Sequence, residues 1–230
     1  MKKVFIDAGH GGTDSGATGQ GLREKDITLS IAKKVESILM QYQIEVKQSR
    51  VKDNYLSLND RAKMSNNWSP DIFISIHVND ASNHSANGIE TFSYPKSQKG
   101  RELAKSIQDE LVDSKLWKSN RGIKTANFAV LRQTKAPAAL VELGFINNTH
   151  DNNILKSKED ILAELVANGI LNYLKIPIKR KDTIINNTHW AEKHYNSLSE
   201  KGITIHEKRY DDTITRAELF ALLDRIIGEI

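Results

Sequence analysis

Cysteine is absent from this 230-residue chain, and proline is scarce, with four residues. A chain without thiols has no disulfides, no thiolate metal site and no cysteine nucleophile. Any metal ion would have to be held by histidine, aspartate or glutamate. Long apolar runs are also missing, since none approaches the roughly 20 residues that a membrane-spanning helix needs. The sequence therefore predicts no membrane span.

The first residues, MKKVFIDAG, have an apolar core of only VFI, which Asp7 ends. A secretion signal needs an apolar core of roughly 7–15 residues. We therefore expect the chain to be synthesised in the cytosol without a signal peptide. A net charge of +4 and a pI near 9.1 mildly favour anionic partners. The basic residues are scattered and lack an interleaved aromatic platform, so nucleic acid is not an expected partner.

Apolar runs alternate with helical patterns along residues 1–174. Nearly continuous apolar runs predict buried strands at 3–8, 71–78 and 139–145. Apolar residues at the 3.6-residue period predict helices at 26–42, 98–117 and 158–174. Further strands are expected at 44–46, 88–94, 123–124 and 130–132. This alternation predicts an α/β fold with a twisted, mostly parallel central sheet flanked by helices.

The character of the chain changes at KIPIKRKD, where Pro177 and a basic run are typical of a linker. Beyond it, helical patterns at 188–201 and 215–228 predict a small all-α hairpin. We therefore expect a catalytic domain over 1–176, a linker over 177–187 and a helical module over 188–230.

Three apolar runs each end in a polar side chain that is suited to chemistry. His10 follows VFIDAG, His77 follows FISI, and Glu142 follows AALV. Ligands of α/β sheets lie at the carboxyl ends of the strands, so these side chains converge if the strands are neighbours. Glu24 is expected in the loop before the first helix, where it can fold back over the same edge of the sheet.

Two other interpretations of AGHGG are open at this point. A lone His10 would be explained by a tight turn, and a glycine-rich stretch can bind phosphate. The phosphate interpretation lacks its pattern, because neither G-x-G-x-x-G nor G-K-[ST] is present. Two histidines and two glutamates are, by contrast, the set that a catalytic zinc ion needs. Such a site uses three nitrogen or oxygen ligands, a position for water and a separate carboxylate for protons.

Eight motifs agree in order and spacing with a known family. They are D-x-G-H-G-G-x-D-x-G-A, E-K-D-x-x-L, L-x-x-R, F-I-S-I-H-x-N, G-I-E-T-F, R-G-I-K, V-L-R and V-E-L-G-F-I-N. Over about residues 2–175 the chain resembles the zinc-dependent N-acetylmuramoyl-L-alanine amidases, the type-3 amidase family of phage and bacterial lysins.

The resemblance implies one zinc ion with His10, Glu24 and His77 as ligands, and Glu142 as the catalytic residue. Asn79 matches a family asparagine near the metal, and we expect it to bind substrate. One departure is Ala8, where the family usually has proline.

The implied reaction is cleavage of the amide between the lactyl group of N-acetylmuramic acid and L-alanine of the stem peptide. Peptidoglycan is then the expected partner. The enzyme would reach it after release from the cytosol, as an endolysin or autolysin does. Two alternatives are a zinc peptidase that cuts within the stem peptide and a non-catalytic wall-binding protein. A binding protein has no need of all four site residues.

The last 43 residues resemble a single surface-layer-homology repeat. The residues that carry this resemblance are Trp190, Leu198, Gly202 and the stretch T-R-A-E at 215–218. This resemblance implies binding of a secondary cell-wall polymer, and a degenerate helical hairpin is the alternative. Its apolar faces would pack on the catalytic domain or against a second chain, which would make a dimer.

Other polar residues have simpler explanations. Arg61 follows a helix-capping pattern at 57–60, and an ion pair that orders a loop is the preferred explanation over a role in substrate binding. His189 and His194 are five residues apart, which places them on different sides of a helix. We expect the remaining histidines to be exposed, namely His84, His150 and His206.

Overall fold

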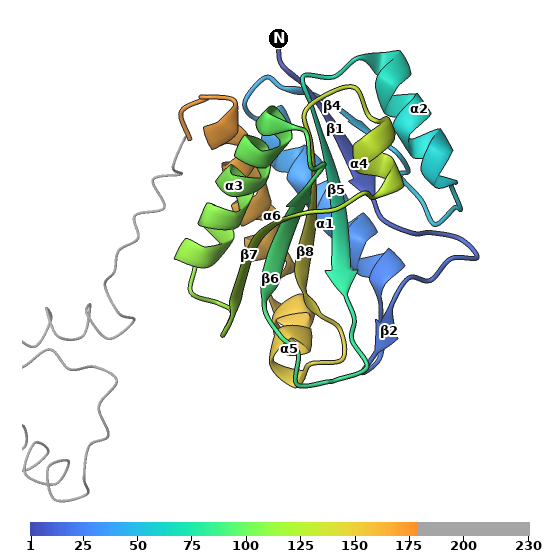
Figure 1. Ribbon diagram of the computed structural model, residues 1–230, viewed down its shortest axis with the longest axis vertical. Coiled ribbons are helices and arrows are strands. Elements are labelled where there is room, and N and C mark those ends of the chain that lie inside the picture. The colour runs from blue at the N-terminus through green and yellow to red at the C-terminus, as the bar shows by residue number, and fades with distance from the viewer. Residues whose placement is uncertain (179–230) are drawn as a thin grey trace, which may run out of the picture. The chain divides into compact units, whose positions relative to one another are not determined.

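A six-stranded sheet is the centre of the computed structural model, which describes residues 1–178 (Figure 1). The strand order is β4-β1-β5-β8-β6-β7. The first four are mutually parallel, β6 is antiparallel to β8, and β7 is parallel to β6. The predicted mostly parallel sheet is confirmed. Its strands are β1 (Lys3–Ala8), β4 (Glu45–Gln48), β5 (Ile72–Asn79), β6 (Ile89–Ser93), β7 (Asn120–Thr125) and β8 (Ala138–Phe145).

Helices cover both faces of the sheet, as predicted. On one face α1, α3 and α6 pack together, and on the other α2 packs against α4 (Figure 1). A short hairpin, β2 (Thr18–Gly19) and β3 (Leu22–Arg23), precedes α1. The helices are α1 (Glu24–Met40), α2 (Leu58–Trp68), α3 (Gln98–Asp113), α4 (Ala129–Gln133), α5 (Thr149–Ser157) and α6 (Glu159–Tyr173).

The two faces of the sheet differ because successive side chains of a strand point to opposite faces. Val4 and Ile74 join the large core under α1, α3 and α6. Phe5 and Phe73 join a smaller core with α4, and their rings stack with centroids 5.7 Å apart. His77 lies further along β5 and points to this second face, where an apolar residue would otherwise extend the core. The smaller core therefore ends where the polar side chains of the strands begin.

Two local predictions differ from the structure, and one helix was not predicted. Residues 130–132 are not a strand but lie in α4, where Val130 and Leu131 are buried in the smaller core. Helix α1 begins at Glu24 rather than at Asp26. Helix α5 has no predicted counterpart, and its N-terminus is capped by Asn148, whose side chain accepts from two backbone N–H groups. A short apolar run does not distinguish a strand from one buried helical turn.

Residues Met1–Ile178 form one compact unit. The predicted helices at 188–201 and 215–228, and most of the predicted linker, lie outside the described residues. None of the helices that the structure describes is long and apolar enough to cross a membrane.

Candidate metal centre

His10 lies in the turn that follows β1, in a left-handed backbone conformation with φ of 60°. Its Nδ1 is 2.9 Å from Oδ2 of Asp14, which leaves Nε2 directed at Glu24. A carboxylate on one ring nitrogen fixes the orientation of the ring and the tautomer, and this is the usual arrangement around a metal-binding histidine. Sequence reasoning missed the role of Asp14, although the motif G-H-G-G-x-D contains it.

Two buried arginines hold this turn through its carbonyl groups. Arg61 donates to the carbonyl oxygens of Ala8 and His10 and pairs with Asp7, with Nη1 2.7 Å from Oδ1. Arg50 donates to the carbonyl oxygens of Ala8 and Gly9. The expected ion pair of Arg61 is confirmed. Ala8, where a proline is usual, is itself fully buried, and its carbonyl accepts from both guanidinium groups.

Glu24 is the first residue of α1, and its side chain is nearly fully buried. Backbone N–H groups hold both carboxylate oxygens, since Val78 donates to Oε1 and Ala17 donates to Oε2. Burial alone would raise the pKa of Glu24, but hydrogen bonds from His10 and His77 hold that pKa far below its usual range. The carboxylate is therefore charged and fixed in place.

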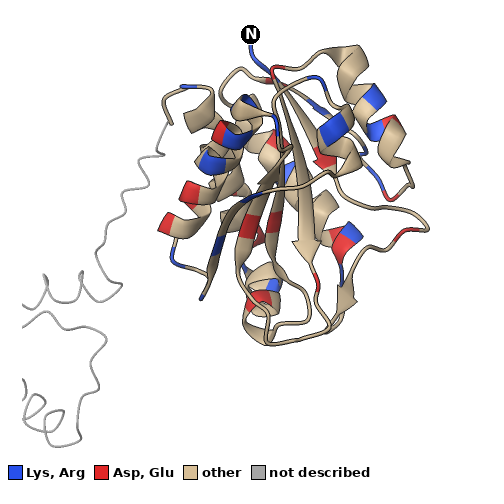
Figure 2. Ribbon diagram, viewed as in Figure 1, with Lys and Arg blue, Asp and Glu red and all other residues tan. Residues whose placement is uncertain are grey.

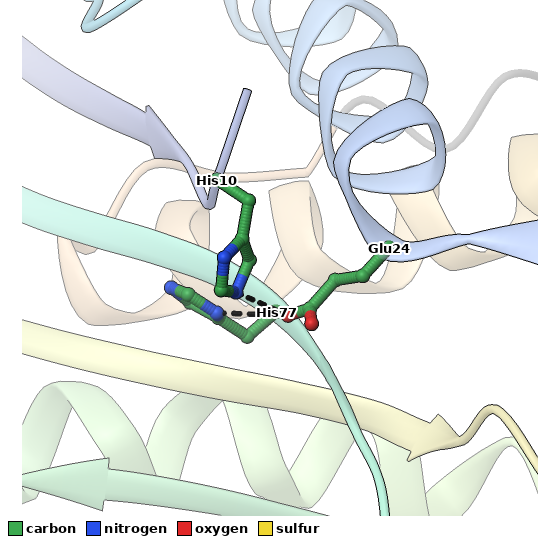
Figure 3. Close-up of side chains that lie close together, drawn as sticks. All are labelled: His10, Glu24 and His77. Atoms are coloured by element: carbon green, nitrogen blue, oxygen red, sulfur yellow. Dashed lines mark hydrogen bonds and ion pairs between the residues drawn. The ribbon is translucent and has the colours of Figure 1, made fainter. Parts of the chain in front are cut away.

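The side chains of His10, Glu24 and His77 meet at one point (Figure 3). Oε1 of Glu24 is 3.2 Å from Nε2 of His10 and 2.9 Å from Nδ1 of His77. The two imidazole rings lie edge to face with centroids 5.0 Å apart. Burial alone would lower the pKa of His10, but the carboxylates of Glu24 and Asp14 raise it.

Glycines provide the space for this cluster. A Cβ atom at Gly9 would lie 2.5 Å from Cε1 of His77. A Cβ atom at Gly16 would lie 2.6 Å from both Oε2 of Glu24 and Cδ2 of His10. Larger residues at these two positions would displace the imidazoles or the carboxylate.

The donor set of this cluster fits a zinc ion. One ligand atom from each of His10, Glu24 and His77 lies within 4.8 Å of the others. Two imidazole nitrogens and one carboxylate oxygen are a common ligand set of catalytic zinc sites. Outer contacts, from Asp14 to His10 and from backbone N–H groups to Glu24, orient the ligands as such a site requires.

Glu142 lies beside this cluster, on β8. It is the register partner of His77 on the neighbouring parallel strand β5, so both side chains are on the same face of the sheet. Its Oε2 is buried and has no hydrogen-bond partner among the described residues. Burial, together with the nearby charges of Glu24 and Glu90, raises the pKa of Glu142 well above its usual value. Glu142 therefore has the properties of a proton-transferring residue.

Asn79 is directed at Glu90 rather than at the three clustered side chains. Its Nδ2 donates to Oε1 of Glu90 over 2.7 Å. The other oxygen of Glu90 accepts from Arg121 and Lys124 of β7. Figure 2 shows acidic positions side by side on β6 and β8, with basic positions on β7. Sequence reasoning missed Glu90, although the family motif G-I-E-T-F contains it.

The other two histidines of residues 1–178 do not join the cluster. His84 is exposed, as expected. His150 is instead half-buried, and its Nε2 is 3.0 Å from the carbonyl oxygen of Leu116. Three further histidines lie outside the described residues, namely His189, His194 and His206.

Known proteins share this fold and much of this sequence. Residues 4–172 match the Amidase_3 family model, described as N-acetylmuramoyl-L-alanine amidase. The sporulation-specific N-acetylmuramoyl-L-alanine amidase of Bacillus subtilis is 45% identical over 175 residues, which cover 74% of this chain and 67% of that protein. The endolysin of Bacillus phage SPP1 is 38% identical over 188 residues, covering 77% and 68% respectively.

Solved structures agree with the sequence comparison. The crystal structure of an N-acetylmuramoyl-L-alanine amidase from Clostridium difficile 630 is similar with a TM-score of 0.72 and 40% identity, and the match covers 76% of this chain and 97% of that one. The catalytic domain of CwlV from Bacillus (Paenibacillus) polymyxa var. colistinus gives the same TM-score at 36% identity, covering 77% and 100%. This chain therefore belongs to the Amidase_3 family of N-acetylmuramoyl-L-alanine amidases, and it is a hydrolase of that class.

Proposed function

We propose that this enzyme uses one zinc ion, held by His10, Glu24 and His77, to cleave the amide between the lactyl group of N-acetylmuramic acid and L-alanine. The observation that supports this most is the position of Glu142. A half-buried carboxylate lies directly across from the proposed ligand His77, and one of its oxygens has no hydrogen-bond partner within residues 1–178. Three ligands and one separate carboxylate match the active sites of zinc hydrolases, in which the ligands hold the ion and the carboxylate transfers protons.

Zinc, when bound there, would lower the pKa of water and polarise the scissile carbonyl group. Glu142 accepts a proton from the attacking water and then donates it to the leaving amino group of L-alanine. One C–N bond breaks and one C–O bond forms, so the products are the free lactyl carboxylate and a free amine. The raised pKa of Glu142 suits this double role, because a proton carrier works best with a pKa near the working pH.

The fixed surroundings of the ligands support the same proposal. Arg50 and Arg61 hold the carbonyl groups around His10, and backbone N–H groups hold Glu24. Side chains fixed in this way need little rearrangement during the reaction. Such preorganisation lowers the activation free energy and is a main source of rate enhancement in enzymes. Asn79 stays a predicted substrate contact, and its bond to Glu90 places it at the side of the cluster toward β6.

Digestion of purified peptidoglycan tests this proposal. We expect products with free L-alanine amino termini and intact glycan, identified by mass spectrometry, and no products when a chelator is present. Readdition of zinc should restore cleavage. New amino termini within the stem peptide would instead show a zinc peptidase, and an undigested wall that retains the protein on sedimentation would show a binding protein.

We also propose that residues 188–230 direct the enzyme to a secondary cell-wall polymer, and that the enzyme acts on the wall after release. The resemblance to a surface-layer-homology repeat supports this part of the proposal. Sedimentation with purified cell walls compares the full chain with a chain ending at Ile178. Equal binding of both chains would contradict this part of the proposal. Light scattering of the two proteins without cell walls would show whether the C-terminal segment makes a dimer.

A further inference from the structure

Glu90 is a buried carboxylate that the proposed reaction does not use. It is 4% exposed and lies on β6, where it is the antiparallel register partner of Glu142. Residues in such a pair have side chains on the same face, with Cβ atoms about 5 Å apart. Glu90 therefore lies one strand beyond Glu142 and two strands beyond His77.

Two cations share one oxygen of this carboxylate. Nε of Arg121 is 2.8 Å from Oε2 of Glu90, and Nζ of Lys124 binds the same atom. The pKa of Glu90 is lower than usual, because these two cations outweigh the effect of burial. One negative charge thus faces two positive charges, and the group retains a net positive charge beside the catalytic Glu142.

The geometry of Arg121 leaves it able to bind a further anion. Its guanidinium lies over the ring of Phe145, 4.8 Å from the centroid, which fixes its plane. Within residues 1–178 its only hydrogen-bond partner is Glu90, through Nε, so both terminal NH₂ groups are available. The side chains of Arg121 and Lys124 are 35% and 40% exposed, so a ligand can reach them from solvent. A guanidinium with two free NH₂ groups is well suited to a carboxylate.

We propose that Arg121 and Lys124, held in place by Glu90, bind a carboxylate on the residue that follows L-alanine in the stem peptide. This inference rests on the proposed function. A D-glutamate that is linked through its γ-carboxyl keeps its α-carboxylate free. The enzyme would then prefer a stem peptide with that carboxylate over one in which it is a carboxamide.

The spacing of the strands agrees with the size of such a substrate. Adjacent strands are about 4.8 Å apart, so Glu90 is about 10 Å from His77 along the sheet. Six covalent bonds separate the scissile carbonyl carbon from the α-carboxylate carbon, and an extended chain of that length spans about 7 Å. The charged ends of Arg121 and Lys124 lie at Glu90, and a hydrogen bond of about 3 Å to the substrate carboxylate covers the remaining distance.

Two synthetic substrates test this subsite. Both are N-acetylmuramoyl-L-alanyl-D-glutamate with the γ-carboxyl blocked as a methylamide, and one carries the α-carboxylate as a carboxamide. For the zinc-loaded full chain we expect KM to be lower for the acid by roughly tenfold to a hundredfold, the range for a hydrogen bond to a charged group. Arg121→Gln should raise KM for the acid by a similar factor and change KM for the carboxamide little.

Matched variants and a binding measurement complete the test. Lys124→Gln should weaken the preference, and Lys47→Gln should leave it intact, because Lys47 is an exposed cation on β4, at the opposite edge of the sheet. Calorimetry on the Glu142→Gln protein measures binding of both compounds without turnover. Equal affinity for acid and carboxamide, or a preference that survives Arg121→Gln, would overturn the subsite. Absence of cleavage with a clear preference in binding would instead count against the proposed reaction alone.

Discussion

Oε1 of Glu24 lies 2.9 Å from Nδ1 of His77, although the two residues are 53 positions apart in the chain. The same oxygen is 3.2 Å from Nε2 of His10. A carboxylate between two imidazoles is stabilised by protons on the rings, and a divalent cation at this point would replace those protons. Metal binding and protonation should therefore compete at this cluster.

Replacement of His77 by alanine should abolish stoichiometric zinc binding, because two of the three proposed ligands do not complete the site. Metal content of the purified protein, measured by mass spectrometry, checks this. His84→Ala is the matched control, since His84 is exposed and outside the cluster. Unchanged zinc content in the His77→Ala protein would refute its assignment as a ligand.

Glu142→Gln should retain zinc and lose cleavage by a factor on the order of 10²–10⁴, the usual contribution of a general acid or base. The amide keeps the shape of the side chain but no longer accepts a proton from water. Release of L-alanine amino termini from peptidoglycan gives the rate. Glu164→Gln, at an exposed position of α6, should stay fully active. A Glu142→Gln enzyme with near-normal activity would remove Glu142 from the mechanism.

Gly16→Ala should weaken zinc binding on the order of 10–100-fold, the effect of a disturbed outer contact. The added methyl group would meet both Glu24 and His10. Gly21→Ala is a close control, since Gly21 also has a positive φ, of 82°, but a Cβ there meets no atom within 4 Å. Both variants should lose some stability from backbone strain. Equal zinc affinity in the two proteins would show that strain alone, and not the contact, matters at Gly16.

Asp7→Asn should destabilise the fold by about 3–5 kcal/mol at neutral pH, because it leaves Arg61 as an unpaired buried charge. Urea unfolding of the variant and the parent measures this difference. A difference below about 1 kcal/mol would show that the buried pair contributes little.

The same pair predicts how stability depends on pH. Burial alone would raise the pKa of Asp7, but Arg61 and the hydroxyl group of Ser75 hold it below its usual value. A carboxylate with a lowered folded-state pKa contributes its full stabilisation above the unfolded value of about 3.9. That contribution is lost as the pH falls through the lower folded-state pKa. The stability difference between the parent and Asp7→Asn should therefore be constant from pH 7 to 5 and shrink in stronger acid.

Much of the fold was predictable because three strands are buried on both faces. Such strands are continuous apolar runs, and the polar residues that interrupt or follow them, His10, His77 and Glu142, are conspicuous. The structure confirms that β1, β5 and β8 are neighbours, as the predicted convergence requires. The start of α1 was harder to place, since no side chain caps it and Glu24 follows a two-residue strand.

Other parts of the site leave no local pattern. Glu90 alternates with apolar neighbours in G-I-E-T-F, as an exposed strand residue would. Only its partner across the strands, Glu142, and the cations of β7 reveal that it is buried in a site. Arg50 follows β4 in a loop, and it donates to two carbonyl groups of a distant turn. Contacts of this kind depend on the tertiary structure.

The pairing of β5 with β8 also links activity to completion of the fold. Since His77 faces Glu142 only in this register, a slip of one residue would place Val141 or Leu143 there and turn the carboxylate to the other face. Glu142 is also the last of the four proposed site residues to leave the ribosome. If Glu142 transfers the proton, a chain that ends before Glu142 or pairs β8 in another register would be inert, and hydrolysis would report that β5 and β8 have paired correctly.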